Sequence, residues 1–324
     1  MESNTKKYVS KYDAKKLFEE SGVGAAEIVK ECETGEFNTV YSVRSNGKRY
    51  YLKFGSDDST PTLNYEKDML RAELAAYAAL EGTDVLRPTI VFADTSREKI
   101  NVDYFITEGL DAPLQGLTFP NLKARKRVMY QLGADVAKIH AVKGTEFGYF
   151  QFGKKPTWAE AYKLMIDKIV ADATVLNVRI DTFRVYAVLD RVKDILAEVT
   201  ESSLVHGDLW AGNVFVNRKN FTYQGLIDWE RAFWGDIAAD FATLAPRGNI
   251  ERNRYFVKGY NSVTPIEFNA KLHTRIDLMK LYYGMVMITE PELRWKKGSF
   301  QYNIHKYYGR KVFNKALKAL EKPL

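Results

Sequence analysis

One short stretch carries the clearest chemical signal in the chain: residues 206–213, which read HGDLWAGN. Its aspartate, Asp208, is followed five residues later by Asn213, and apolar residues typical of a strand come next. In phosphoryl transfer, a carboxylate at the first position accepts the proton of the attacking hydroxyl group, and an amide oxygen at the second holds a magnesium ion on the nucleotide phosphates. The spacing therefore predicts a phosphoryl-transfer loop with Asp208 as the base and Asn213 as a metal ligand.

A second carboxylate follows at a matching distance. Asp228 lies fifteen residues beyond Asn213, in the sequence LIDWE at residues 226–230. A hairpin between the two would bring Asp228 beside the first loop, where it can bridge magnesium to the β- and γ-phosphates. Polar residues of this kind can also serve only as caps or loop ligands, but three of them within 21 residues, between apolar strand segments, favour the chemical interpretation. We interpret His206 as a brace for the loop rather than as a base.

The elements that must position these residues differ between the two parts of the chain. The first third is predicted to be strand-rich, and Asn46-Gly47 is a strong two-residue hairpin signal. A helix rich in alanine and free of Gly and Pro is expected over Leu63–Leu80. The strands expected in this part are Ala26–Glu33, Thr39–Arg44, Arg49–Phe54, Thr89–Asp94 and Val102–Thr107.

After Gly109 the pattern becomes mostly helical. Apolar residues recur at helical spacing over Leu122–Val142 and Phe183–Val199, and helices are expected again from Ile237 onward. One strand pair, Val214–Val216 with Gly225–Ile227, interrupts them. The architecture predicted is an α+β fold with two lobes, residues 1–108 and residues 109–324, joined near 108–111.

Taken together, these motifs resemble the aminoglycoside phosphotransferase-like enzymes, which share the protein-kinase-like fold. The resemblance runs from about Val29 to Leu244. It implies a bilobal fold with an antiparallel-sheet N-lobe carrying one main helix and a mostly helical C-lobe. It also implies ATP, or alternatively GTP, with Mg²⁺ as cofactors, and transfer of the γ-phosphate to a hydroxyl group of a small molecule. In this family pattern Asp208 is catalytic, and Asn213 and Asp228 bind the metal.

The resemblance also implies nucleotide-binding residues in the N-lobe. Residues 33–38, ETGEFN, look like the family's shortened nucleotide-positioning loop, with Gly35 and Asn38 near the phosphates. Lys53 looks like the third-strand lysine that grips the α- and β-phosphates. Glu73 resembles the helix glutamate that pairs with this lysine, and Glu66, earlier in the same segment, is the alternative partner.

The hinge and the segments that support the catalytic loop complete the resemblance. Residues 105–110, FITEGL, look like the hinge between the lobes, where adenine would contact the carbonyl of Glu108 and the amide of Leu110. Residues 235–242, GDIAADFA, resemble the segment in which two aspartates tether loops rather than react. His140 is interpreted as structural.

Two departures from protein kinases bear on the substrate. Residues 228–230, DWE, replace the DFG motif, and no APE segment follows, so a protein substrate is not expected. Trp210 gives the loop the HGDLW sequence of fructosamine kinases, whereas the downstream IDWE and GDxxxD patterns fit aminoglycoside and related small-molecule kinases better.

The distribution of charge bears on the acceptor. Residues 1–110 carry a net charge of −4, residues 111–240 carry +1 and residues 241–324 carry +10, so the surplus of +7 lies in the last quarter. One interpretation is a solvated face of a terminal amphipathic helix, with Lys311, Lys315 and Lys318 on it. The other is a neutral or anionic acceptor. A third interpretation is a local pocket that binds a cation through acidic side chains. Six residues are candidates for it: Glu230, Asp236, Glu251, Asp277, Glu290 and Glu292.

Other function classes have less support. The single cysteine, Cys32, allows no intramolecular disulfide, and the four histidines are too scattered for a metal-hydrolase cluster. No signal peptide or membrane span is expected, which favours a cytoplasmic protein. The alternatives are a metabolic kinase for a sugar, fructosamine, choline-like or amino-acid acceptor, a nucleotide-binding pseudokinase, and a nucleic-acid-binding protein, for which no recognisable module is present.

Overall fold

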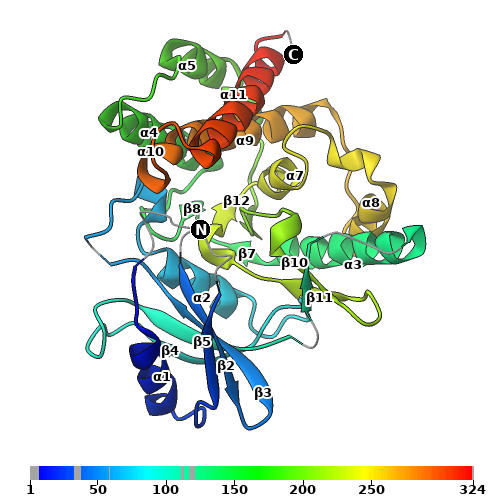
Figure 1. The fold of residues 1–324 in the computed structure, drawn as a ribbon. Coiled ribbons are helices and arrows are strands. Elements are labelled where there is room, and N and C mark those ends of the chain that lie inside the picture. The colour runs from blue at the N-terminus through cyan, green and yellow to red at the C-terminus, as the bar shows by residue number, and fades with distance from the viewer. Residues whose placement is uncertain (1–6, 33–37, 58, 111–112, 117–120, 323–324) are drawn as a thin grey trace.

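The computed structural model describes residues 7–32, 38–57, 59–110, 113–116 and 121–322. A five-stranded antiparallel sheet forms the first part, in the order β1-β2-β3-β5-β4, with helices packed against it (Figure 1). Its elements are α1 (Lys11–Glu20), β1 (Ile28–Glu31), β2 (Thr39–Ser45), β3 (Lys48–Phe54), the 3₁₀ turn η1 (Asn64–Glu66), α2 (Met69–Ala79), β4 (Ile90–Asp94) and β5 (Tyr104–Glu108).

The turn between β2 and β3 sets which way Lys53 points. Asn46 and Gly47 both have positive φ, 50° and 73°, as a tight hairpin requires, and Ser45 pairs with Lys48. Successive side chains then alternate between the faces of β3. Leu52 and Phe54 are buried in the apolar core beneath α1, whereas Lys53 lies on the opposite face.

The prediction of one continuous helix over Leu63–Leu80 is wrong, because the segment forms a 3₁₀ turn followed by a separate helix. The turn η1 comes first, and α2 begins only after Asp68, which has a left-handed backbone with φ 51°. The reason lies in Glu66, whose carboxylate accepts the amide of Leu63 at 2.9 Å and pairs with Arg294 at 2.7 Å. These contacts hold a tight turn where helix propensity alone would continue the helix.

Helices dominate the second part, together with two small sheets. The sheets have the orders β11-β10-β6 and β7-β9-β12-β8. The strands are β6 (Pro113–Gln115), β7 (Lys143–Gly144), β8 (Gly148–Tyr149), β9 (Ser202–Val205), β10 (Val214–Asn217), β11 (Tyr223–Leu226) and β12 (Phe233–Gly235). The helices and turns are α3 (Leu122–Ala141), α4 (Trp158–Val175), α5 (Thr182–Arg191), α6 (Lys193–Ala197), η2 (Ala211–Asn213), η3 (Trp229–Arg231), α7 (Ala238–Leu244), η4 (Ile250–Arg252), α8 (Arg254–Asn261), α9 (Ala270–Thr289), α10 (Pro291–Arg294) and α11 (Phe300–Leu320).

The prediction of a single helix over Phe183–Val199 is also wrong, because this segment forms two helices. It is divided into α5 and α6 by Val192, whose φ of −101° and ψ of 11° leave the helical region. Val192 is itself fully buried, and Ile195 and Leu196 beyond it are buried too. Packing of both segments against the core therefore overrides the continuous helical periodicity.

Two apolar clusters stabilise the two parts. The smaller one lies between the five-stranded sheet and α1, and the larger one fills the helical part. Ala76, Tyr77 and Leu80 of the α2 region belong to the larger cluster, so α2 joins the two parts. We propose the lobe boundary after Glu108, because β5 ends there and β6 pairs with β10 of the other part. None of the helices in the described part of the chain combines the length and the apolar composition that a membrane span requires.

Candidate active site

The loop that carries Asp208 is suspended between β9 and η2 and is held from two sides. The backbone amides of His206 and Gly207 donate to the carboxylate oxygens of Asp240 on α7, at 3.0 and 2.8 Å. The His206 ring contacts the carbonyl oxygen of Ile227 through Nε2 at 3.0 Å, which is the bracing role expected of it. Gly207 has φ 74°, and a Cβ there would lie 2.2 Å from the carbonyl oxygen of Arg231, so no other residue fits.

Asn213 lies directly beside Asp208. Its Nδ2 donates to the backbone carbonyl oxygen of Asp208 at 2.9 Å and to the carboxylate Oδ2 at 3.0 Å. The carbonyl of Asn213 in turn accepts the amide of Ile227 at 3.1 Å, which draws the segment of Asp228 against the loop. The antiparallel pair of β10 and β11 thus brings the segment of Asp228 back to Asn213, fifteen residues earlier in the chain.

Lys53 stands at the centre of a cluster of carboxylates. Its Nζ lies 2.6 Å from Glu73, 2.6 Å from Asp228 and 3.2 Å from Glu230. Burial alone would lower the pKa of Lys53, but Asp228, Glu73 and Glu230 outweigh it and hold that pKa well above its usual range. The lysine is therefore a permanent positive charge among three acids.

The three acids respond differently to this setting. Burial would raise the pKa of Asp228, but the charge and hydrogen bond of Lys53 hold it below its usual range. Burial raises the pKa of Glu73 despite its contact with Lys53. Burial, followed by the charge of Asp228, raises the pKa of Glu230 to about 8. Asp228 is thus the carboxylate of the group whose ionised form its surroundings favour most, and it is also the most exposed, at 31% of its side chain against 3% for Glu73 and 7% for Glu230.

These donors fit a divalent cation. Glu73, Asp228 and Glu230 each offer an oxygen within 4.8 Å of the others. Oxygen ligands, with only one or two carboxylates supplied by the protein, are what Mg²⁺ takes when nucleotide phosphates complete its shell. Asp228 also has φ 68°, a left-handed conformation that a short polar side chain tolerates.

Asp208 has the environment of a carboxylate that can take up a proton. Burial is the main cause that raises its pKa, the nearby Asp228 adds to this, and Arg231 opposes it. A carboxylate with a raised pKa accepts a proton from a hydroxyl group more readily than a solvated one. A carboxylate that could serve as a base thus lies on the loop that meets oxygen donors able to hold a metal, and Lys53 contacts those donors. Phosphoryl transfer uses groups of these kinds.

The other residues expected to bind nucleotide are placed as follows. Gly35 lies outside the described residues. Asn38 is buried, and its Nδ2 donates to Glu230 across the lobes. The side chain of Glu108 pairs with Lys48 at 3.1 Å, and its amide donates to Thr89 at 2.9 Å. Leu110 follows Gly109 at the end of β5 and is half-buried.

Glu66, the alternative partner of Lys53, lies elsewhere. It belongs to a buried polar cluster in which Arg294 contacts Glu66 at 2.7 Å and Arg231 contacts Glu290 at 2.7 Å. Tyr65 joins it through a hydrogen bond to Glu290 and the Arg231 guanidinium over its ring. Sequence reasoning missed this cluster, because Glu66 and Arg294 are 228 residues apart and nothing local pairs them.

The sequence indicates Glu230 only as a candidate for the acceptor site, yet in the structure it faces Lys53 and Asn38. Its position two residues after Asp228 was the signal that could have found it. Because Glu230 and Asp228 lie two residues apart in a turn, their side chains can reach the same neighbour, which here is Lys53.

Comparison with known proteins agrees with this geometry. A model of the phosphotransferase enzyme family matches residues 28–262. A "probable ketoamine kinase" of Vibrio parahaemolyticus is 26% identical over 268 residues, covering 77% of this chain and 82% of that protein. Another of Escherichia coli is 23% identical over 300 residues, covering 84% and 93%.

Solved structures share the fold. The aminoglycoside phosphotransferase APH(4)-Ia superposes with a TM-score of 0.66 at 19% identity, covering 97% of this chain and 100% of that one. A Thermobifida fusca protein assigned as a fructosamine-3-kinase gives 0.68 at 20% identity, with 94% and 100% covered. The protein-kinase-like α+β fold predicted from the motifs is thereby confirmed. Because the family model spans most of its length, the chain belongs to the phosphotransferase enzyme family.

Proposed function

We propose that this phosphotransferase moves the γ-phosphate of ATP to a hydroxyl group of a small molecule, with Mg²⁺ as cofactor and a ketoamine as the first acceptor to test. The observation that carries the proposal is the position of Lys53, whose ammonium group contacts Glu73 and Asp228 while Asp208 and Asn213 share a hydrogen bond on the facing loop. GTP is the alternative donor. A cytoplasmic site of action belongs to the same proposal.

Each residue has one role in this scheme. Glu73 orients Lys53, which holds the α- and β-phosphates, and Asp228 and Asn213 hold the metal. Mg²⁺, when bound, neutralises charge on the phosphates. Asp208 orients the acceptor and takes the proton of its hydroxyl group as the oxygen bonds to the γ-phosphorus and the bond to ADP breaks. Catalysis of this kind rests on positioning and on neutralisation of charge.

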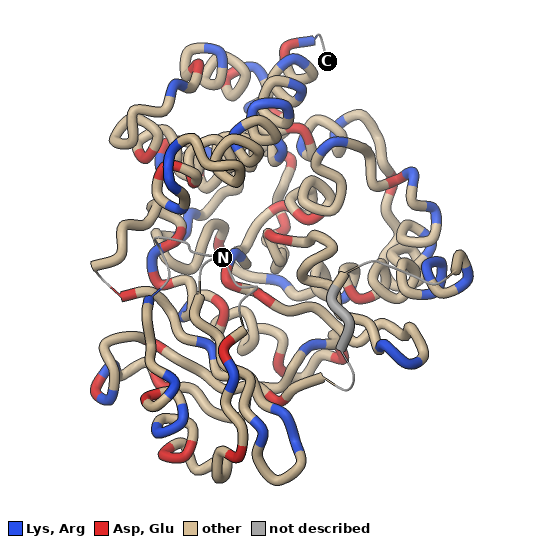
Figure 2. The backbone as a smooth tube through the Cα atoms, in the orientation of Figure 1, with Lys and Arg blue, Asp and Glu red and all other residues tan. Residues whose placement is uncertain are grey.

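The acidic candidates for a cationic acceptor all lie beside basic side chains of the protein. Each lies within 4 Å of a basic group: Glu230 with Lys53, Asp236 with Arg275, Glu251 with His273, Asp277 with Lys280, Glu290 with Arg231, and Glu292 with Lys306. None of the six is thus left as a free carboxylate for a polycation. Figure 2 shows Lys and Arg recurring along the C-terminal helix α11. The pairing of these six carboxylates favours a ketoamine over an aminoglycoside, in agreement with the names of the sequence relatives.

The terminal basic side chains themselves support only the solvated-face interpretation. Lys311, Lys315 and Lys318 are exposed on α11, whereas Val312 and Leu317 on the other face are buried. No nucleic-acid function is proposed for them.

A coupled assay of ADP release tests the function. The acceptors are a glucose-derived lysine ketoamine, kanamycin, hygromycin B, simple sugars, choline and amino acids, each with ATP and with GTP, and with and without EDTA. We expect Mg²⁺-dependent turnover on the ketoamine that is absent in Asp208→Asn. Turnover only on an aminoglycoside would overturn the acceptor assignment, and nucleotide binding without turnover on any acceptor would favour a pseudokinase.

A further inference from the structure

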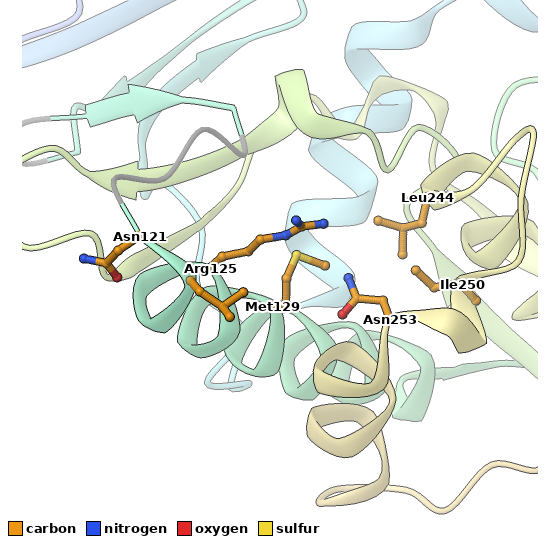
Figure 3. A pocket seen from close by; sticks show the side chains of 7 residues that line it. Asn121, Arg125, Met129, Leu244, Ile250 and Asn253 are labelled. Carbon is orange, nitrogen blue, oxygen red and sulfur yellow. The ribbon is translucent and has the colours of Figure 1, made fainter.

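A cavity of about 600 Å³ lies in the helical part among residues to which phosphoryl transfer gives no role. It opens between the first turns of α3, the end of α7, η4 and the residue that caps α8. Figure 3 shows its lining: Asn121, Leu122, Arg125, Met129, Leu244, Ile250 and Asn253. Its volume falls within the range of roughly 300–1,000 Å³ that is usual for small-molecule sites.

The cavity has an apolar floor and an apolar edge. Met129 and Ile250 are buried, and Leu244 is half-buried at the end of α7. Leu122 is 62% exposed although it is a large apolar residue. An apolar side chain at the rim of a concave site gains from contact with an apolar ligand.

The polar groups that remain free in the cavity are donors. In Figure 3 the guanidinium group of Arg125 reaches from α3 over the cavity toward Leu244. Across the described ranges of the chain, the guanidinium group of Arg125 has no carboxylate within ion-pair distance and makes no hydrogen bond. The side-chain Oδ1 of Asn253 accepts the amide of Phe256 at 3.3 Å, so its Nδ2 is the group left for a ligand.

The surroundings are strongly basic. Around the cavity, residues 122–129 at the start of α3 and residues 244–258 carry seven further cations: Lys123, Lys126, Arg127, Arg247, Arg252, Arg254 and Lys258. The one acid of these stretches, Glu251, lies 3.0 Å from His273. The pKa of Tyr255 is lowered, first by a hydrogen bond from Lys126 and further by Arg254 and Lys258, as expected in a positive potential. An anion would be attracted here, and a cation would not.

We propose that this cavity binds a small amphipathic anion, with a carboxylate, sulfonate or phosphate group on Arg125 and an apolar body over Met129, Leu244 and Ile250. The partly enclosed shape favours a small molecule over a polyanion lying across the surface. The site also adjoins the phosphoryl-transfer loop: Thr243, the neighbour of Leu244, accepts the amide of Leu209 at 3.1 Å. The proposal does not rest on the proposed kinase activity.

The test is a binding measurement on the full chain. The probe is 8-anilinonaphthalene-1-sulfonate, an anion whose fluorescence rises in apolar sites, and its neutral counterpart is N-phenyl-1-naphthylamine. Saturating Mg²⁺ and ATP are present so that the nucleotide site is filled. We expect Arg125→Gln to weaken binding of the sulfonate about ten-fold, the effect of one lost charge-assisted hydrogen bond, and to leave binding of the neutral probe unchanged. The matched control is Arg179→Gln, an exposed arginine between α4 and α5.

A second variant guards against a folding artefact. Leu122→Glu places a negative charge at the rim, in the first turn of α3, where an acidic residue favours the helix. It should repel the sulfonate, whereas Leu122→Gln should weaken both probes equally. Equal binding of the sulfonate by the wild type, Arg125→Gln and Leu122→Glu would overturn the proposal.

The location is checked by the methyl resonances of the seven methionines. With ¹³C-methyl methionine, addition of the sulfonate should shift the resonance of Met129, assigned through Met129→Leu. Shifts confined to other methionines would place the probe elsewhere and refute the site. Displacement of the sulfonate by a single-stranded oligonucleotide, with steep salt dependence, would replace the small-anion assignment with nucleic acid.

Discussion

Lys53 Nζ lies 2.6 Å from Oδ1 of Asp228, so the carboxylate proposed to bind the metal is already paired with a cation of the protein. Burial would raise the pKa of Asp228, but Lys53 outweighs burial and holds this pKa below its usual range. Asp228 is the carboxylate of this cluster for which this is so. Magnesium with ATP would share this carboxylate with Lys53 and give Lys53 phosphate oxygens as further partners. Asp228 therefore joins the lysine and the metal in one electrostatic unit.

Asp228→Asn should abolish Mg²⁺-dependent binding of nucleotide. Asparagine keeps a side chain that tolerates φ 68°, whereas alanine would add backbone strain. The neutral amide cannot supply the charge that holds a divalent ion. Calorimetric titration of ATP with Mg²⁺ and with EDTA measures the effect, and Asp190→Asn, an exposed aspartate on α5, is the control. Binding of Mg²⁺ with ATP equal to that of the wild type would remove Asp228 from the metal site.

Asp208→Asn should lower kcat by about 10²–10⁴-fold, the usual contribution of a general base, while nucleotide affinity changes little. The reason is that Asp208 contacts Asn213 but has no contact with Lys53 in the structure. Steady-state kinetics on the acceptor found in the screen, with calorimetry of ATP binding, separate the two effects. Turnover near the wild-type rate would show that another group takes the proton.

Glu73 and Glu66 should give opposite phenotypes. Glu73→Gln weakens the grip on Lys53 and should raise the KM for ATP about ten-fold, as expected for one charge-assisted hydrogen bond. Glu66→Gln removes the charge of one of the two carboxylates that face the buried Arg294, the other being Glu290 at 3.4 Å. It should destabilise the fold by about 1–3 kcal/mol, with kinetics unchanged where the protein is folded. Thermal unfolding and ATP kinetics on both variants distinguish them. A kinetic defect in Glu66→Gln alone would reverse the assignment of the lysine partner.

Local patterns were sufficient to predict the hairpin at Asn46-Gly47, the antiparallel sheet and the approach of Asp228 to Asp208. These features depend on neighbours in the chain, because a two-residue turn or a short strand pair closes over few residues. The break at Asp68 could not be predicted in this way. It follows from the contact of Glu66 with Arg294, which helix propensity does not contain.

The same limit applies inside the site. The hydrogen bond from Asn38 to Glu230 joins residues 192 positions apart and depends on how the lobes pack. A glutamate next to a metal-binding aspartate can face the metal, the acceptor or the lysine. Only the folded chain places Glu230 on Lys53. The turn η3 is held against α2 there by the hydrogen bond that the amide of Trp229 donates to Glu73 at 3.3 Å.

Glu230 should make the stability of the protein depend on pH in a defined direction. Burial and the charge of Asp228 raise its pKa to about 8, compared with an ordinary value of 4.5. Between these values the folded protein holds a proton that the unfolded chain has released. The contribution of Glu230 to stability is therefore complete below pH 4.5 and is lost as the pH rises toward 8. Asp208 and Glu73, whose pKa values are also raised by burial, act in the same sense.

Glu230→Gln isolates this one group. The amide oxygen still accepts from Asn38, but the side chain no longer titrates. We expect the fall in Tm between pH 5 and pH 8, measured without nucleotide and in EDTA, to be smaller in Glu230→Gln than in the wild type. Glu81→Gln, at an exposed position after α2, should keep the wild-type dependence. Parallel curves of Tm against pH for the wild type and Glu230→Gln would mean that Glu230 is ionised throughout this range. Lys53 would then face a charged Glu230 in addition to Asp228 and Glu73.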